Sequence, residues 1–389
     1  MRLPIRVLSV LLAPQWGGLH GMIEQTTPGL KAAGVQRIVA LPASDPEIVR
    51  RLEASGALVA PVDFVRLRRS LNPATQAKYL LGLRRDVRRV TELIQEHGAD
   101  VVEVAGLFAL QPAIAATKAR VPLVWQLHST MGPQRVRNLM GRIVAKTADA
   151  VMTSGKSMIP RHGGLDDIAD EIIPFSASVN TEAFHPDLKV REAMRAQFGV
   201  DENEVVVGTL GNRAWQKRHE LLLDAAALLL PQNPHLKFLV VGNDVPSNVP
   251  YYRREVVTRA KALNDRFPGR VLLCTQNAPV SAIMSVFDVF ALTSVAEGAS
   301  LVTAEAMAMG LPVVSVDVGS LPDLVRPGHT GCLANPNAGA LSLAIRQVLV
   351  NRHAFGRAAR EFVLARKEDP VDAHLHAYRY ALDSRARSR

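Results

Sequence analysis

Two glutamates, Glu297 and Glu305, stand eight positions apart in the segment AEGASLVTAEAMAMGLPVV, residues 296–314. Carboxylates that act as acid and base on one bond lie roughly 5 to 9.5 Å apart. On a single helix, a spacing of eight residues separates two side chains by about 12 Å along the axis. The spacing therefore argues against an acid–base pair and favours two carboxylates that hold two ends of one elongated ligand.

The residues around the glutamates predict a strand, a turn and a helix. The apolar run VFALTS, residues 289–294, is typical of a buried strand. Ser300 is expected to cap the following helix with its side chain, and Gly310 with Pro312 is expected to end it. Glu305 then lies about two turns, or slightly less, along the segment.

Glu297 falls in the predicted turn, where Gly298 allows a tight bend and the small residues Ala299 and Ser300 let a ligand approach the backbone. Free amides and the helix dipole make such a turn an anion site suited to a diphosphate. The alternative is a surface glutamate in the turn and a helix glutamate paired with a lysine. The apolar surroundings of Glu305 count against that alternative, because a buried carboxylate without a partner is costly.

A second group of candidate residues lies in VGTLGNRAWQKRHELLLDAAALLL, residues 207–230. The pattern indicates a strand, a glycine turn, a basic loop and an amphipathic helix. Arg213, Lys217 and Arg218 would lie at the mouth of a parallel sheet, where they could neutralise a diphosphate. The alternative is a solvated basic helix start. Because cations there oppose the helix dipole, the anion-binding role is favoured.

The first half of the chain offers weaker signals. Gly17 and Gly18 directly follow the first apolar run, which is typical of a backbone-to-phosphate approach although the GxGxxG pattern is absent. His128 ends the run PLVWQLH, a position from which a side chain reaches the ligand-binding edge of a parallel sheet. A structural and a functional role for this histidine both remain open.

Short apolar runs that alternate with helical patterns must position these residues. They are IRVLSVLLA, RIVALPA, VVEVAGL, LVWQLH, AVMTSG and EIIPFS in the first half, then EVVVGTLG, KFLVVGN, RVLLCT, VFALTS and PVVSVD. Continuous apolar runs indicate parallel strands covered on both faces. The sequence therefore predicts an α/β protein with two Rossmann-like, doubly wound parallel-sheet domains that face a central cleft.

A length of 389 residues also favours two domains. Pro186 interrupts the chain before a new helix and strand. We therefore place an N-terminal domain at 1–185 and a C-terminal domain at 186–369. The tail, 370–389, is expected to form a helix that crosses back to the N-terminal domain.

Composition narrows the range of partners. The 46 Lys+Arg against 36 Asp+Glu give a formal charge of +10, which favours anionic partners. Three tryptophans and five tyrosines are too few for a nucleic-acid stacking platform, so no nucleic-acid partner is expected. Cys274 and Cys332 have no metal-binding or CxxC spacing, which indicates free thiols, no metal site and a cytoplasmic location.

Two segments raise the question of a membrane. The start, MRLPIRVLSVLLAP, resembles a signal peptide, but no small-residue cleavage site follows and a buried strand is favoured. The basic segment 64–90 suits either an anionic lipid surface or an ordinary solvated helix, so peripheral contact with the inner face of the plasma membrane stays open. Its cations are Arg66, Arg68, Arg69, Lys78, Arg84, Arg85, Arg88 and Arg89.

The segment EGASLVTAEAMAMGLPVVSVDVGSLPDLVRPGHTGCLANP resembles the donor-site signature of the retaining GT-B glycosyltransferases of family 4, the glycogen-synthase-like glycosyl transferases group 1. Its E-G-x-S, its second glutamate at the eighth position and its G-x-P-V-V carry the likeness. The resemblance extends to VGTLGNRAWQKRHELLLDAA, IIPFSASVNTEAFHP and GADVVEVAGLFALQPAIAA, so it covers nearly the whole chain.

This resemblance implies transfer of a sugar from a nucleoside diphosphate sugar to a hydroxyl acceptor, with retention of configuration and without a metal or other cofactor. UDP-sugars are the favoured donors, and GDP-sugars are possible. The acceptor is a glycan, a lipid-linked compound or a small molecule. The N-terminal domain would bind the acceptor and the C-terminal domain the donor.

Matching positions imply the role of each candidate. Glu297 would bind the hydroxyls of the donor sugar, Glu305 the ribose and Lys217 the diphosphate, while His128 would lie near the sugar. Glu297, His128 and Lys217 are the catalytic candidates. The other donor-binding candidates are Gly17, Gly18, Asn212, Arg213, Thr275, Gln276, Gly298, Ala299, Ser300 and Leu301.

Three positions depart from the family pattern. Asn212 stands where the family has an arginine, and Arg213 next to it is the candidate replacement. Asn243 and Thr275 replace glycines. Asn212 and the basic segment also motivate a different hypothesis, a non-catalytic sugar-nucleotide-binding protein. An epimerase or a phosphorylase on the same architecture is a further alternative.

Overall fold

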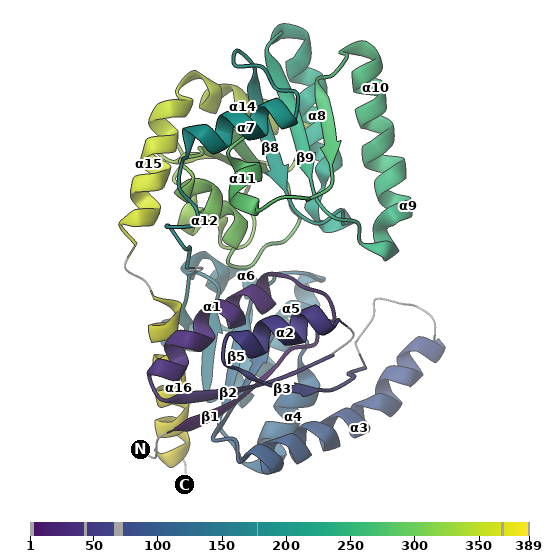
Figure 1. The fold of residues 1–389 in the computed structure, drawn as a ribbon. Coiled ribbons are helices and arrows are strands. Elements are labelled where there is room, and N and C mark those ends of the chain that lie inside the picture. Colours follow the sequence, from purple (N-terminus) through teal and green to yellow (C-terminus); the bar gives the residue numbers. More distant parts are fainter. Residues whose placement is uncertain (1–3, 43–44, 66–72, 177, 367–368, 388–389) are drawn as a thin grey trace. The chain divides into compact units, whose positions relative to one another are not determined.

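The computed structural model describes residues 4–42, 45–65, 73–176, 178–366 and 369–387 (Figure 1). The chain divides into two compact units. Unit 1 comprises residues 1–178 and 368–389, and unit 2 comprises residues 179–367. The first division falls a few residues before the predicted 185/186.

Unit 1 is built on a seven-stranded parallel sheet of order β3-β2-β1-β4-β5-β6-β7. The strands are β1 (Ile5–Val10), β2 (Val35–Leu41), β3 (Leu58–Pro61), β4 (Val101–Ala105), β5 (Leu123–Leu127), β6 (Ala150–Thr153) and β7 (Ile173–Pro174). Its helices are α1 (Gly18–Ala32), α2 (Pro46–Ala54), α3 (Pro73–His97), α4 (Leu110–Ala119), α5 (Gln134–Thr147), α6 (Ile159–His162) and α16 (Pro370–Arg387), with 3₁₀ turns η1 (Lys156–Met158) and η2 (Asp166–Glu171).

Unit 2 has a six-stranded parallel sheet of order β10-β9-β8-β11-β12-β13. The strands are β8 (Val205–Leu210), β9 (Leu236–Val241), β10 (Val271–Cys274), β11 (Val289–Leu292), β12 (Val313–Val316) and β13 (Gly331–Ala334). Its α-helices are α7 (Leu188–Gln197), α8 (His219–Leu229), α9 (Val249–Tyr252), α10 (Thr258–Arg266), α11 (Val280–Met284), α12 (Leu301–Ala308), α13 (Leu321–Leu324), α14 (Ala338–Val350) and α15 (Arg352–Leu364). Shorter segments are η3 (Trp215–Lys217), η4 (Leu230–Gln232), η5 (Pro246–Asn248) and the π-helical η6 (Arg253–Val257).

Both units therefore have the predicted architecture, a doubly wound parallel sheet. In unit 2, successive residues of one strand enter two different cores: Val207 packs on one face of the sheet and Val206 on the other. Phe238 and Leu239 of β9 divide in the same way. Because both faces are covered, these strands are apolar throughout, which is the pattern that the sequence shows.

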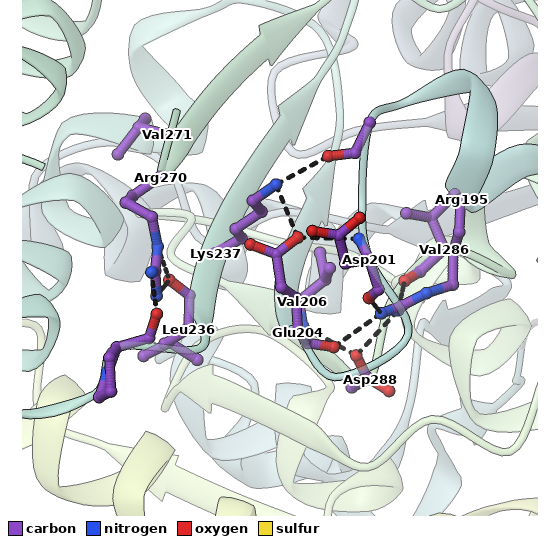
Figure 2. A network of polar contacts seen from close by, with 12 residues as sticks. Arg195, Asp201, Glu204, Val206, Leu236, Lys237, Arg270, Val271, Val286 and Asp288 are labelled. Carbon is purple, nitrogen blue, oxygen red and sulfur yellow. Dashed lines mark hydrogen bonds and ion pairs between the residues drawn. The ribbon is translucent and has the colours of Figure 1, made fainter. Parts of the chain in front are cut away.

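A network of charged residues lies at the amino-terminal edge of the unit 2 sheet (Figure 2). Arg195 of α7 pairs with Asp288 at 3.3 Å and donates to the carbonyls of Asp201 and Glu204. Lys237 and Glu204 form an ion pair of 2.7 Å beside it. This network fixes α7 to the sheet at the edge opposite to the carboxyl ends of the strands.

The part of the chain that the structure describes contains no helix long and apolar enough to cross a membrane. Of the basic segment, Arg66, Arg68 and Arg69 lie outside the described residues, as does the side chain of Lys78. Arg84 and Arg88 are exposed on α3, whereas Arg85 pairs with Asp86 at 2.9 Å and Arg89 pairs with Glu92 and Glu96. Part of the basic charge is thus neutralised within the helix.

Candidate active site

The central contact of the candidate site joins two predicted residues of unit 2. Lys217 Nζ lies 2.7 Å from Glu297 Oε1, and both side chains are largely buried. The stem of Lys217 packs on Gly211, where a Cβ atom would lie only 3.2 Å from Lys217 Cε. Lys217 follows β8 and Glu297 follows β11, and these strands are neighbours in the sheet. The carboxyl ends of two adjacent strands therefore bring the ammonium and the carboxylate together.

Thr293, a residue that the sequence analysis missed, holds the basic loop in place. Its hydroxyl lies 2.8 Å from the carbonyl oxygen of Lys217 and 2.9 Å from that of Arg218. Arg218 itself has a left-handed backbone, with φ of 48°. The amide of Val295 donates to the carbonyl of Gln216 at 2.8 Å. The end of β11 thus fixes the loop that carries the lysine.

The turn that carries Glu297 is closed by the loop after β12. Gly319 has φ of 55°, and a Cβ atom there would lie 2.2 Å from the carbonyl oxygen of Glu297. The Ser320 hydroxyl donates to the carbonyl of Gly298. A side chain at position 319 would collide with this carbonyl, so only glycine permits the approach. The glycine of VGSLPD, residues 318–323, was the sequence signal for this contact.

The start of α12 differs from the prediction. Ser300 occupies the cap position with a left-handed backbone, φ of 42°, and makes no capping bond with its side chain. Its hydroxyl instead lies 2.8 Å from that of Thr303. The amide of Thr303 donates to the carbonyl of Ser300 at 3.0 Å, whereas the amides that precede it at the helix start have no partner within the helix. The expected side-chain cap is therefore wrong, and the amides around Ala299 and Leu301 stay available for an anion.

Glu305 also differs from the prediction in its position along α12. It lies four residues after Leu301, little more than one turn into α12 rather than about two. Its carboxyl is mostly buried, and desolvation raises its pKa to about 7. Among the described residues, no cation pairs with it. Because no described lysine pairs with Glu305, the alternative of a helix glutamate paired with a lysine is wrong; Lys217 pairs with Glu297 instead.

Asn212 and Arg213 do not join the Lys217–Glu297 pair. Asn212 is exposed. Arg213 Nη1 lies 3.1 Å from Asp244 Oδ1, and its guanidinium carbon lies 5.3 Å from the centre of the Tyr252 ring. Its side chain is thus engaged on the β9 side of the basic loop.

Thr275 and Gln276 directly follow β10, at the same carboxyl edge of the sheet as Lys217 but two strands from β8. Thr275 is exposed and Gln276 is partly buried. Asn243, the third departure from the family pattern, is exposed after β9 and accepts a backbone bond of 2.8 Å from Arg213.

In unit 1, the predicted glycines begin a helix. Gly17 caps α1 with an extended backbone, and Gly18 is its first residue. Among the described residues, a Cβ atom on Gly18 would meet no atom within 4 Å outside the backbone of its own helix, so open space distinguishes this position. Trp16 beside them is covered by the guanidinium of Arg51, 3.6 Å from the ring centre.

His128 directly follows β5 and is buried, with 9% of its surface exposed. Its Nε2 lies 2.9 Å from Oε1 of Gln126. Burial lowers the pKa of His128 to about 3, so the ring is neutral at ordinary pH. Gln126 and the buried Glu103 were missed, although a single polar residue inside each of the runs VVEVA and LVWQL was a signal.

Within the described residues, no group of three or more His, Cys, Asp or Glu is arranged to hold a metal ion. The thiols of Cys274 and Cys332 are free. The arrangement in unit 2 therefore consists of a lysine, a carboxylate and the amides of a helix start. These groups can bind a polar anionic ligand and stabilise negative charge that develops on it.

Known proteins with related sequences point to one family. Residues 204–351 match the family described as glycosyl transferases group 1, and residues 17–159 match the glycosyl transferase 4-like domain. A D-inositol 3-phosphate glycosyltransferase of Rhodococcus erythropolis is 30% identical over 261 residues, which cover 64% of this chain and 56% of that protein. An alpha-maltose-1-phosphate synthase of Mycolicibacterium smegmatis is 27% identical over 284 residues, covering 71% of this chain and 72% of that protein. The chain thus spans little more than half of the first of these relatives.

Solved structures share the fold. Anabaena HepE in complex with UDP-glucose has a TM-score of 0.78 at 22% identity, covering 98% of this chain and 100% of that chain. A sucrose-phosphate synthase from Thermosynechococcus elongatus has a TM-score of 0.70 at 20% identity, covering 96% of this chain and 97% of that chain.

Proposed function

Because the chain belongs to the group 1 glycosyltransferases, with the GT-B fold, we propose that it transfers a sugar from a nucleoside diphosphate sugar to a hydroxyl acceptor. We propose a UDP-sugar as donor, since HepE, which shares the fold, was solved with UDP-glucose. Retention of the anomeric configuration and independence of metal ions belong to the same proposal and rest on the family resemblance.

The contact between Lys217 and Glu297 carries this proposal. An ammonium has three donors, and Glu297 accepts from Lys217 at 2.7 Å. The lysine can therefore keep that bond while it also binds a diphosphate oxygen. Glu297 has further lone pairs for the hydroxyls of a sugar. The pair thus provides one group for each side of a glycosyl–phosphate bond, and the amides of α12 lie next to it in the chain.

In the proposed reaction, the bond between the anomeric carbon and the phosphate oxygen breaks as the acceptor oxygen bonds to that carbon on the same face. The acceptor proton passes to the leaving phosphate oxygen, and a nucleoside diphosphate is released. Negative charge grows on the diphosphate during this step. Lys217 and the amides of Ala299 to Leu301 are fixed before the reaction, so they stabilise that charge without reorganisation.

Glu305 would hold the ribose of the donor. A carboxylate accepts hydrogen bonds from both hydroxyls of a diol, and it does so best when ionised. Desolvation alone raises the pKa of Glu305 to about 7, so a ligand that donates two hydrogen bonds supplies what this carboxyl lacks. On this proposal, donor binding and ionisation of Glu305 are coupled.

The acceptor is proposed to be a hydroxyl compound that is a glycan, a small molecule or a lipid-linked intermediate. We propose a cytoplasmic location, and the exposed Arg84 and Arg88 of α3 motivate the lipid-linked case, because they would offer positive charge to an anionic membrane surface. Sedimentation with vesicles that contain anionic lipid tests this. Binding that disappears in Arg84→Ala/Arg88→Ala supports the lipid-linked case, and unchanged binding excludes a role for these two arginines.

The test of the proposed function is incubation of the protein with UDP- and GDP-sugars, with and without a panel of hydroxyl acceptors. Nucleoside diphosphate released only with an acceptor, and a product with the donor's anomeric configuration by NMR, would support retaining transfer. Conversion of the donor sugar without acceptor would indicate an epimerase. Tight binding of the donor with no turnover on any acceptor would favour a non-catalytic binding protein.

A further inference from the structure

A row of buried polar side chains in unit 1 runs from the C-terminal helix α16 to the candidate histidine, His128. Its members come from β2, β4, β5 and α16, and each is at most 3% exposed. They are Arg37, Glu103, Gln126, His374 and Tyr378. Polar groups this deeply buried are costly unless each finds its partner, so the network fixes which atoms donate and which accept.

The network begins with a buried charge pair. Nη2 of Arg37 lies 3.6 Å from Oε2 of Glu103. The Tyr378 hydroxyl bridges the two residues: it accepts a hydrogen bond from Arg37 at 2.9 Å and donates one to Glu103 at 2.8 Å. Burial alone would raise the pKa of Glu103, but Arg37 and the surrounding donors hold it below its ordinary value. Glu103 is therefore ionised and can only accept hydrogen bonds.

This carboxylate sets the orientation of the Gln126 amide. Gln126 Nε2 donates to Glu103 Oε1 at 2.6 Å, and the same nitrogen lies 2.9 Å from Nε2 of His374. His374 must therefore accept at Nε2. Its Nδ1 then carries the proton, which it donates to the carbonyl of Pro370 at 2.6 Å. The contacts with Gln126 and Pro370 agree with one neutral tautomer, and Nε2 of His374 lies farther, 3.5 Å, from Oε1 of Glu103.

The other end of the amide determines the state of His128. Gln126 Oε1 lies 2.9 Å from Nε2 of His128, and a carbonyl oxygen requires a donor there. His128 therefore carries its proton on Nε2 and leaves Nδ1 as an acceptor. A flipped Gln126 would instead point its oxygen at the Glu103 carboxylate and at the lone pair of His374, so two contacts oppose the flip.

We propose that Gln126 and His374 are positioning residues that hold His128 in the Nε2–H tautomer, so that its Nδ1 accepts a hydrogen bond from a ligand hydroxyl. The inference rests on the proposed function for the part of His128 in catalysis. The proposal gives α16 a specific role. His374 of this helix, 248 residues from Gln126 in the sequence, orients the Gln126 amide, which in turn sets the tautomer of His128.

Burial keeps both histidines uncharged. Burial lowers the pKa of His128 to about 3, and the attraction of Glu103 opposes this only in part while His374 and His162 lower it further. Burial also lowers the pKa of His374. The positive charge of Arg37 lowers this pKa further, whereas the negative charges of Glu103 and Asp369 raise it without cancelling the effect of burial. The ring of Phe175 packs 5.3 Å from His128 and 5.8 Å from His374, centre to centre, which restrains both rings.

The direct test is NMR of the full chain labelled with ¹⁵N at the histidine rings, because the shifts of Nδ1 and Nε2 report the tautomer. The wild type is expected to show His128 protonated at Nε2 and His374 at Nδ1. In Gln126→Met, His128 should populate both tautomers. His376→Phe is the matched control, because His376 is exposed on the same helix. His128 protonated at Nδ1 in the wild type would overturn the proposal even if Gln126→Met fails to fold.

Kinetics then separate the positioning role from the proposed function. We expect kcat to fall about tenfold in Gln126→Met, corresponding to one lost hydrogen bond in the transition state. The kcat of His374→Phe should lie between that of Gln126→Met and that of the wild type, and the kcat of His376→Phe should match the wild-type value. Wild-type kcat in both Gln126→Met and His374→Phe would refute the positioning role. If the wild type transfers no sugar, the proposed function fails, while the tautomers measured by NMR still decide the structural part.

Discussion

Replacement of Glu305 by glutamine should change stability and ligand binding in opposite directions. The carboxyl is buried without a cation, and desolvation raises its pKa from 4.5 to about 7. Because the folded-state pKa lies above the unfolded-state value, the unfolded chain ionises first as the pH rises. Glu305 therefore destabilises the fold progressively between these two pH values, and the full penalty is present above pH 7.

The size of the effect follows from the shift. Each pKa unit corresponds to about 1.4 kcal/mol, so a rise from 4.5 to about 7 gives a penalty of about 3 kcal/mol. Glutamine has a similar shape and does not ionise. In Glu305→Gln the free energy of unfolding should therefore match the wild type near pH 4 and exceed it by about 3 kcal/mol near pH 8.

Urea unfolding of both proteins across this pH range measures the difference, and the common contributions of other carboxyls cancel. Titration with UDP gives the second half of the test. Loss of an ionised acceptor should weaken binding on the order of tenfold at pH 8, and wild-type affinity should fall as the pH drops below the pKa of about 7. Stability curves that stay parallel at all pH values would refute the assigned burial, and unchanged UDP affinity would refute the ribose contact.

Two further substitutions test other parts of unit 2. Asn212→Arg places the family arginine on an exposed position and should raise the affinity for UDP about fivefold at low salt. This gain should shrink as salt screens the added charge. Unchanged affinity in a titration series at different salt concentrations would show that position 212 does not contact the phosphates. Gly208→Ala puts a Cβ atom 2.2 Å from the Phe287 ring and should lower the free energy of unfolding by about 1–3 kcal/mol. Gly21→Ala in α1 of unit 1 is the control, because a Cβ atom there would lie within 4 Å of no described atom outside the backbone of its own helix; it should show no such loss, and equal losses would contradict the packing explanation.

Much of the fold was predictable because parallel strands that are buried on both faces are continuous apolar runs. The eleven runs quoted from the sequence all contain strands of the structure. β3 and β13 were missed because they are four-residue strands at the sheet edges, where LVAP ends in proline and GCLA begins with glycine. Short runs with such residues resemble loops.

The candidate site was predictable only where residue type and chain position coincide. Glu297 and Lys217 were predicted separately from a turn and a basic loop, yet their contact depends on the pairing of β8 with β11, which no local pattern specifies. Ser300 was expected to cap α12, but its left-handed backbone turns the hydroxyl to Thr303. Gln126, the partner of His128, is itself held by Glu103 on β4 and His374 on α16, which lie farther away along the chain, so sequence spacing could not reveal this network.

The Lys217–Glu297 pair is tested most directly by comparison with a second lysine–glutamate pair in the same unit. Lys237 and Glu204 also lie 2.7 Å apart, but at the amino-terminal edge of the sheet (Figure 2). Release of nucleoside diphosphate at saturating donor and acceptor should fall on the order of 10²-fold in Glu297→Gln. In Glu204→Gln it should stay at the wild-type rate, although an equivalent ion pair is lost. Turnover near the wild-type rate in Glu297→Gln, or an equal loss in both variants, would contradict the assignment of the catalytic pair.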